Sequence, residues 1–120
     1  MNKKTLVLGA SVNPNRYSYI AIERLIENKY EVRAVGRREG NINGVNIYKT
    51  KKIFKNIDTV SLYLGAKNQV EYYDYILKLN PKRVLFNPGT ENGELEEILS
   101  QHNIAFERAC TLVLLSVGAY

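Results

Sequence analysis

One stretch near the start of the chain decides the fold, and it reads Thr5-Leu6-Val7-Leu8-Gly9-Ala10-Ser11-Val12-Asn13-Pro14-Asn15-Arg16-Tyr17-Ser18. Its first four residues predict a buried strand, and the rest predicts a tight loop that leads into a helix. Such a loop receives phosphate groups in doubly wound α/β proteins, because a helix start offers free backbone N–H groups and a positive dipole end. The dinucleotide pattern G-x-G-x-x-G is interrupted, since Ser11 and Pro14 take its second and third glycine positions. The loop is therefore of the nucleotide type but has different chemistry.

The rest of the chain alternates between strand and helix patterns. The expected strands are 5–8, 31–35, 45–48, 59–64, 83–86 and 104–108. We expect residues 37–43 to form a loop and the basic segment 49–56 to form one or two helical turns. Strands separated by helices predict a parallel sheet with right-handed crossovers. The expected fold is a doubly wound, Rossmann-like α/β domain that spans residues 1–120.

Polar residues at the expected helix starts suggest caps. Ser18 is expected to cap the first helix, Asn68 and Glu71 to form a capping box, and Thr111 to cap the last helix. Three helices are expected to bury apolar faces. These faces are Ile22, Leu25 and Ile26; Val70, Tyr73, Ile76 and Leu77; and Leu95, Ile98 and Leu99.

Composition limits the class of protein. A chain of 120 residues with 45% hydrophobic and 24% charged residues is typical of one globular domain. Its net charge of +5 is compatible with an anionic ligand. The single cysteine, Cys110, excludes an internal disulfide and fits a reducing cytoplasm. No apolar run reaches membrane-spanning length, so we expect a cytoplasmic protein that does not engage a membrane.

A ligand is expected at one edge of the sheet, because doubly wound sheets bind ligands beyond the carboxyl ends of their strands. Most of the segments that follow the expected strands combine glycine or small residues with hydrogen-bonding groups. These segments are 9–11, 36–38, 65–68, 87–91 and 109–111. They predict one shared cleft along this edge.

The end of the second strand distinguishes between ligands. An NAD-binding domain usually has an acidic residue here, which holds the ribose hydroxyls. This chain instead has Gly36, Arg37 and Arg38. Two guanidinium groups favour a ligand with an extra phosphate on the ribose. Both NADP, with its 2′-phosphate, and coenzyme A, with its 3′-phosphate, meet this condition.

Further motifs carry a resemblance that covers essentially the whole chain. They are the loop G-A-S-x-x-P-x-R at 9–16, the strand 59–64, the turn N-P-G at 87–89 and the segment 109–116. With them the chain resembles the small, single-domain CoA-binding proteins, which are similar to the CoA-binding domain of the succinyl-CoA synthetase alpha chain. The resemblance implies that the ligand is coenzyme A or an acyl-CoA.

The resemblance also implies roles for particular residues. Ser11 and the backbone of 9–13 would hold the pyrophosphate, and Arg16 would add charge. Arg37 or Arg38 would meet the 3′-phosphate, although the family more often has a proline-bearing segment there. The segment 64–68 would line the adenosine or upper pantetheine, and the turn at 87–89 would face the pantetheine arm. The expected binding residues are Gly9, Ala10, Ser11, Asn13, Arg16, Tyr17, Arg37, Arg38, Leu64, Gly65, Asn68, Asn87, Pro88 and Gly89.

Nothing in the sequence indicates a reaction. It shows no Ser/His/Asp set, no paired carboxylates and no cluster of metal ligands, so we expect a binding protein without a metal and leave open whether it is an enzyme. Glu91 is interpreted as a helix-start charge, and His102 as a surface residue. Cys110 is interpreted as a small core residue, with a redox role as the alternative.

Two other functions stay open. The first is an NADP-binding reductase or a subunit of one, for which Tyr63 and Lys67 have a suggestive spacing. The second is an interaction module without a small-molecule ligand, whose basic surface meets nucleic acid. The lysines of the segment 49–55 are interpreted as a solvated face, with contact to an acidic partner as the alternative. We do not expect nucleic acid, because the strands are mostly apolar, as buried strands are. A homodimer is compatible with the apolar C-terminal run and the nine tyrosines.

Overall fold

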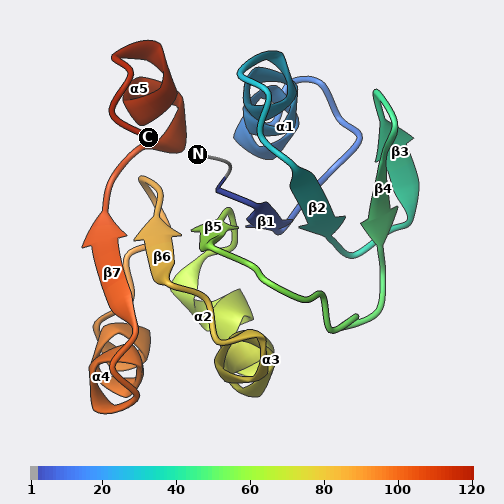
Figure 1. Ribbon diagram of the computed structural model, residues 1–120. Coiled ribbons are helices and arrows are strands. Elements are labelled where there is room, and N and C mark those ends of the chain that lie inside the picture. The colour runs from blue at the N-terminus through green and yellow to red at the C-terminus, as the bar shows by residue number, and fades with distance from the viewer. Residues whose placement is uncertain (1–2) are drawn as a thin grey trace.

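A seven-stranded sheet runs through the centre of the computed structural model, which describes residues 3–120 (Figure 1). Its strands are β1(Thr5–Leu8), β2(Val32–Val35), β3(Gly40–Ile42), β4(Val45–Tyr48), β5(Thr59–Leu62), β6(Arg83–Phe86) and β7(Ala105–Arg108). They lie in the order β3-β4-β2-β1-β5-β6-β7. All neighbours are parallel except β3 and β4. Without β3, the parallel strands have the order of a doubly wound sheet, which confirms the expected fold class.

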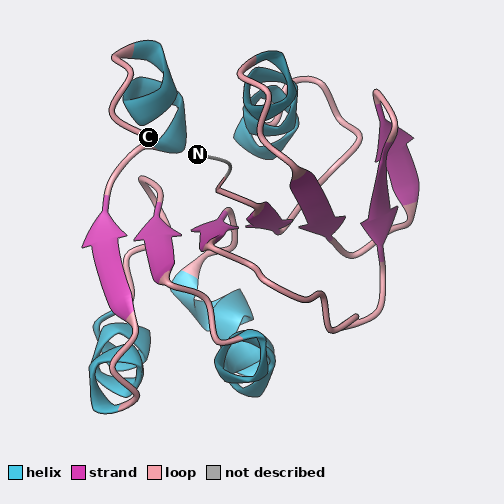
Figure 2. Ribbon diagram, viewed as in Figure 1, coloured by secondary structure: helices cyan, strands magenta, loops and turns pink. Residues whose placement is uncertain are grey.

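Helices cover both faces of the sheet (Figure 2). One face carries α1(Tyr17–Glu27) and α5(Thr111–Ser116), and the other carries α2(Ala66–Gln69), the 3₁₀ turn η1(Val70–Tyr72), α3(Tyr73–Leu79) and α4(Gly93–Gln101). Each face has its own apolar core. Strand β1 serves both, since Leu6 and Leu8 join one core, Val7 joins the other, and all three are 0% exposed. A strand buried on both faces needs this continuous apolar run.

The expected loop at 37–43 is wrong in part, because it contains the edge strand β3. Strands β3 and β4 form a hairpin joined by Asn43 and Gly44. Both residues are left-handed, with φ of 48° and 94°, as a two-residue type I′ turn requires. The Asn-Gly pair was the sequence signal for this hairpin, and the polar residues around it concealed the strand.

The helical turns expected at 49–56 are absent from this described segment, which is irregular. Phe54 in this segment and Ile57 just after it are buried in the core that also holds residues of α3 and α4. The segment connects β4 to β5 and ends near Asn56, which is left-handed with φ of 60°.

The three expected caps are also wrong. Arg16 occupies the cap position of α1, and Ser18 lies buried inside the first turn. Gly65 occupies that position in α2, so Asn68 is a helical residue and forms no capping box. Cys110 precedes α5, and Thr111 is its first residue. The Thr111 hydroxyl is instead bonded to Ser61 Oγ at 2.9 Å, which draws it into the core.

The helical region after β5 buries most of the expected face and adds residues to it. Val70 is 56% exposed, while Ile76 is buried as expected, and Tyr73 and Leu77 are partly buried against the same core. The buried residues are Gln69, Tyr72, Tyr75, Ile76 and Leu79. The tighter winding of η1 breaks the α-helical period and rotates the face. In α4, Leu95 and Leu99 are buried as expected. None of the helices between residues 3 and 120 is long and apolar enough to cross a membrane.

Candidate ligand-binding site

A pocket of about 750 Å³ opens at the carboxyl edge of the sheet. It is lined by the loops that follow β1, β2, β5 and β6. After β1 the chain continues to β2 on one side, and after the neighbouring strand β5 it continues to β6 on the other side. The gap between β1 and β5 is therefore the switch point at which doubly wound sheets bind ligands. Its volume is in the range of small-molecule sites.

The structure brings all but one of the expected binding residues to this pocket, and the exception is Asn87. Four further residues line it that are not among the expected binding residues. They are Val12, Ser18, Tyr63 and Thr90. Each is a chain neighbour of an expected residue, so the loops themselves were the signal for them.

The loop after β1 is folded by its own hydrogen bonds. The Asn13 amide donates to Ser11 Oγ at 3.1 Å, and the Asn15 amide donates to Asn13 Oδ1 at 3.0 Å. The Arg16 amide donates to the Asn13 carbonyl at 3.0 Å. Polar side chains that bond nearby backbone stabilise such turns. These three hydrogen bonds therefore hold the loop in a definite shape.

Gly9 makes the close approach of this loop possible. Its φ is 97°, in the left-handed region that favours glycine, and a Cβ there would lie 2.9 Å from Leu64 Cγ. The loop after β1 thus packs directly against the loop after β5. Only glycine fits both the backbone conformation and this contact.

The start of α1 faces the pocket without a cap. In the described chain, no side chain caps this helix and its first turn has no acidic residue. Tyr17 and Ser18 of the first turn line the pocket. The first N–H groups of a helix lack partners within it, and the helix dipole adds positive potential there. This end of α1 is therefore suited to an anion.

The pocket is electropositive. Arg16, Arg37 and Arg38 line it, and no Asp or Glu is among its described lining residues. All three arginines are exposed, so their guanidinium groups are available to a ligand. Guanidinium groups bind phosphates with two parallel hydrogen bonds. The site combines three such groups with one open helix start.

The opposite wall comes from the loops after β5 and β6. Leu64 and Gly65 form one part, and Pro88, Gly89 and Thr90 form the other. The Gly89 amide donates to Glu91 Oε1 at 3.0 Å, and the Thr90 amide donates to the Asn87 carbonyl at 2.9 Å. This wall offers mainly small and apolar groups to a ligand.

Asn87 does not line the pocket and is 3% exposed. Its Nδ2 donates to Ser61 Oγ and to the Leu62 carbonyl, both at 2.9 Å. Its Oδ1 accepts from the Thr111 amide at 2.8 Å. The side chain therefore joins β5, the end of β6 and the start of α5, and its polar groups are already engaged.

Tyr63 and Lys67 do not form a proton donor site. The Tyr63 hydroxyl is inaccessible and has no hydrogen-bond partner among the described residues. Burial raises the pKa of this phenol to about 12. Lys67 does not line the pocket. The pair whose spacing suggested a reductase is thus not presented to a ligand.

The remaining candidates lie outside the pocket. Cys110 is half-buried before α5, and His102 is exposed at the end of α4, where its Nδ1 lies 2.9 Å from the Ile98 carbonyl. Within residues 3–120, no group of three or more His, Cys, Asp or Glu residues could hold a metal ion.

The chain resembles several solved structures. A crystal structure of an uncharacterized protein is 50% identical, with a TM-score of 0.97, and the match covers 100% of this chain and 99% of that chain. A hypothetical protein from Pyrococcus horikoshii OT3 is 26% identical, with a TM-score of 0.84, over 92% of this chain and 80% of that chain.

A likeness in fold alone extends to the dinucleotide-forming acetyl-coenzyme A synthetase 1 of Ca. Korarchaeum cryptofilum, solved with phosphate and ADP. It is 19% identical, with a TM-score of 0.67, over 87% of this chain and 24% of that chain. Among curated proteins, none matches significantly. Residues 3–116 match the family described as CoA binding domain. This match confirms the resemblance found in the sequence, and the chain belongs to the CoA-binding domain family.

Proposed function

We propose that this protein binds coenzyme A or an acyl-CoA in the pocket at the carboxyl edge of the sheet. The uncapped start of α1 and the loop 9–13 hold the pyrophosphate. Arg37 and Arg38 hold the phosphate on the ribose, and Arg16 adds charge to the pyrophosphate site. The apolar wall formed by Leu64 and Pro88 receives the pantetheine arm.

The observation that carries this proposal is the meeting of three arginines and an open helix start in one pocket whose described lining residues include no Asp or Glu. Each element favours an anion, and together they match a ligand with several phosphate groups. Family membership supports coenzyme A as that ligand. Function here is recognition, so affinity and specificity are the properties to measure.

NADP is the second candidate, since it also has a phosphate on its ribose. The arginines alone do not distinguish it from coenzyme A. The interrupted glycine pattern and the inaccessible Tyr63 hydroxyl both count against a reductase. A ligand comparison separates the two.

The test is calorimetric titration of the purified protein with CoA, dephospho-CoA and NADP in parallel. We expect saturable binding of CoA that is at least about tenfold tighter than that of dephospho-CoA, because one charge-assisted phosphate contact contributes roughly 1.5–3 kcal/mol. The double variant Arg37→Ala/Arg38→Ala should bind CoA no better than dephospho-CoA.

A matched control is Arg24→Ala. This change removes an exposed arginine in the last turn of α1, outside the pocket. It should leave CoA affinity unchanged. Binding of NADP without binding of CoA would favour the reductase, and binding of neither ligand would overturn the proposal.

A further inference from the structure

A glutamine at the end of α2 connects the two loops of the apolar pocket wall. Gln69 is 0% exposed. Its Nε2 donates to the Leu64 carbonyl at 2.7 Å and to the Thr90 carbonyl at 2.8 Å. Leu64 follows β5 and Thr90 follows β6, and both line the pocket. One buried amide group thus holds the two loops at a fixed separation.

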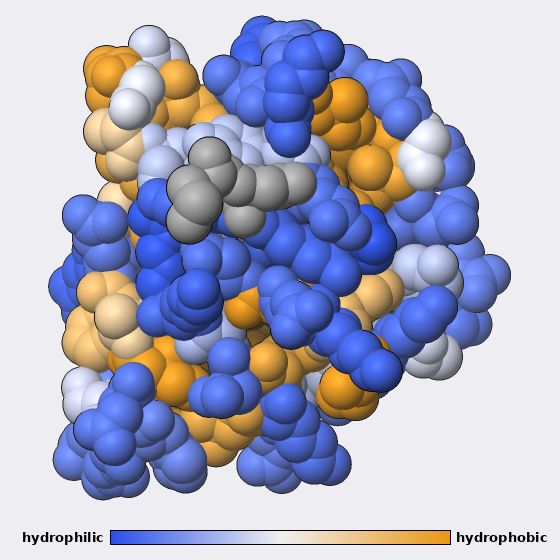
Figure 3. Space-filling view, viewed as in Figure 1, coloured by the Kyte–Doolittle hydropathy of each residue, from blue (hydrophilic) through white to orange (hydrophobic). Residues whose placement is uncertain are grey.

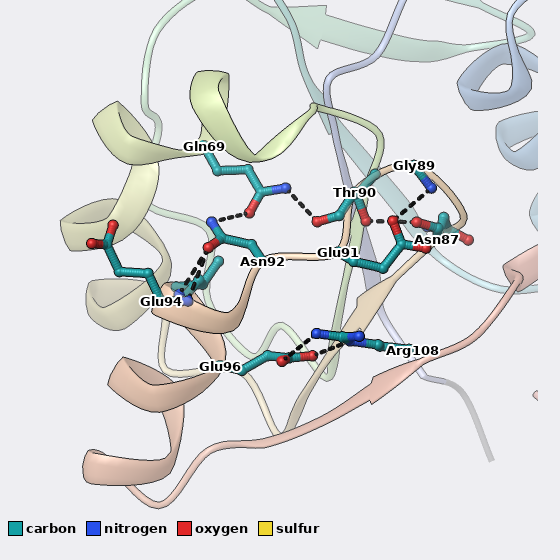
Figure 4. Close-up of polar contacts among 10 residues, drawn as sticks. Gln69, Asn87, Gly89, Thr90, Glu91, Asn92, Glu94, Glu96 and Arg108 are labelled. Carbon is teal, nitrogen blue, oxygen red and sulfur yellow. Dashed lines mark hydrogen bonds and ion pairs between the residues drawn. The ribbon is translucent and has the colours of Figure 1, made fainter.

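A second amide fixes the orientation of the first (Figure 4). Asn92 Nδ2 donates to Gln69 Oε1 at 2.9 Å, so the Gln69 amide cannot rotate without losing this contact. Asn92 is itself held in place, because its Oδ1 accepts from the Glu94 and Leu95 amides at the start of α4. The amide of Gln69 is therefore satisfied at both its nitrogen and its oxygen.

We infer that Gln69 is a positioning residue that sets the spacing of the β5 and β6 loops and so the affinity of the pocket. This inference rests on the proposed function. Gln69 does not line the pocket, so any effect on a ligand has to pass through Leu64 and Thr90. Without this donor, the part-buried Leu64 carbonyl and the buried Thr90 carbonyl lose a partner, and separation of the loops, which admits water, is the simplest way to satisfy them.

The first arm of the test needs no ligand. The variant Gln69→Met keeps the length of the side chain and removes its donor. Hydrogen exchange of the Asn68 and Thr90 amides reports on the two loops, since these amides donate to Gly65 O and Asn87 O. We expect both to exchange at least about tenfold faster relative to Val7, which lies in the central strand and reports global unfolding.

A matched control for this arm is Tyr120→Phe. It removes a buried hydroxyl that contacts Thr5, the first residue of β1, at the end of the strand away from the pocket. It should lower global stability without accelerating exchange of Asn68 and Thr90 relative to Val7. Equal ratios in the wild type and Gln69→Met would overturn the inference, whatever the ligand proves to be.

The second arm uses Gln69→Glu and CoA. A protonated glutamic acid can still donate to one carbonyl, whereas its carboxylate repels both, and burial raises the pKa of such a group. The affinity of the variant relative to the wild type should therefore fall about tenfold or more as the pH rises from about 6 to about 8. Gln69→Met should be weaker than the wild type by a similar factor at every pH.

The two proposals fail in different ways. If the wild type does not bind CoA, the proposed function fails, and the exchange measurement alone decides the role of Gln69. If the wild type binds CoA and the Gln69→Glu ratio is flat with pH, Gln69 is only a structural residue and the inference is wrong.

Discussion

At the scale of single residues, Gly36 decides how closely the first two loops of the pocket approach. A Cβ on this residue would lie 2.2 Å from the Ala10 carbonyl oxygen and 3.2 Å from Ile47 Cγ2. The Ala10 amide donates to Val35 O at 3.0 Å, so the loop after β1 is tied to the end of β2 at this point. Arg37 follows directly, and its position depends on that contact.

We predict that Gly36→Ala destabilises the fold by about 1–3 kcal/mol, because the neighbour that it would strike is backbone and cannot rotate away. It should also weaken CoA binding, since Ala10 and Arg37 would both shift. The control is Gly93→Ala at the start of α4, where a Cβ meets nothing within 4 Å. Urea unfolding and CoA titration of both variants measure the difference, and equal stabilities would show that the loop yields easily.

Tyr63 offers a prediction about pH. Burial raises the pKa of its phenol from 10.0 to about 12. The unfolded chain therefore loses this proton first as the pH rises. The contribution to stability is complete below pH 10 and is lost as the pH rises through about 12, and two pKa units correspond to about 2–3 kcal/mol.

Tyr63→Phe removes this titration. At neutral pH we expect the variant to be within about 1 kcal/mol of the wild type, because the hydroxyl has no hydrogen-bond partner among the described residues. As the pH rises from about 8 to about 11, the variant should become the more stable of the two. Urea unfolding at both pH values measures this, and a constant difference would contradict the assignment.

At the scale of elements, the sequence predicts the central parallel strands well, because each is a short apolar run followed by a turn. It fails where local signals compete with packing. The 3₁₀ turn η1 rotates the helical face, so Val70 is exposed although its spacing suggested burial. The hairpin β3–β4 was missed because Gly40 and Asn41 are poor strand formers, and only the pairing with β4 makes them a strand.

The candidate site could be predicted almost completely, because loops after adjacent parallel strands must meet at one edge of the sheet. Asn87 shows the limit of that reasoning. Its place after β6 was right, but a turn residue can face either the ligand or the core. Nothing in the sequence says that Ser61 and Thr111 would engage its amide.

This contrast separates fold from binding. Asn87→Ala should destabilise the protein by about 2–4 kcal/mol, since the Leu62 carbonyl and the Thr111 amide lose a buried side-chain partner and the Ser61 hydroxyl keeps only Thr111. Asn68→Ala, at an exposed residue that lines the pocket, should leave stability unchanged and weaken CoA binding. Urea unfolding and CoA titration distinguish the two variants. An Asn87→Ala variant that is as stable as the wild type but binds CoA more weakly would show that Asn87 contacts the ligand.

At the scale of the whole molecule, apolar surface and charge lie in different places. Figure 3 shows an apolar area where Figure 1 places α5. Val113 of that helix is 56% exposed, and Val117, directly after the helix, is 68% exposed. A homodimer stays a prediction for that face.

The pocket lies at the carboxyl edge, with three arginines and no carboxylate among its described lining residues. Its potential therefore exceeds what the net charge of +5 alone would give.

Salt should consequently weaken ligand binding, and more strongly for a ligand of higher charge. Raising NaCl from about 50 to about 500 mM shortens the screening length to a few ångströms, so CoA affinity should fall roughly tenfold. Dephospho-CoA should lose less, because it lacks the phosphate assigned to Arg37 and Arg38. In the double variant Arg37→Ala/Arg38→Ala the two ligands should show the same salt dependence, while Arg24→Ala keeps the wild-type difference. Equal slopes for CoA and dephospho-CoA in the wild type would mean that the arginines do not meet the ribose phosphate, even if CoA binds.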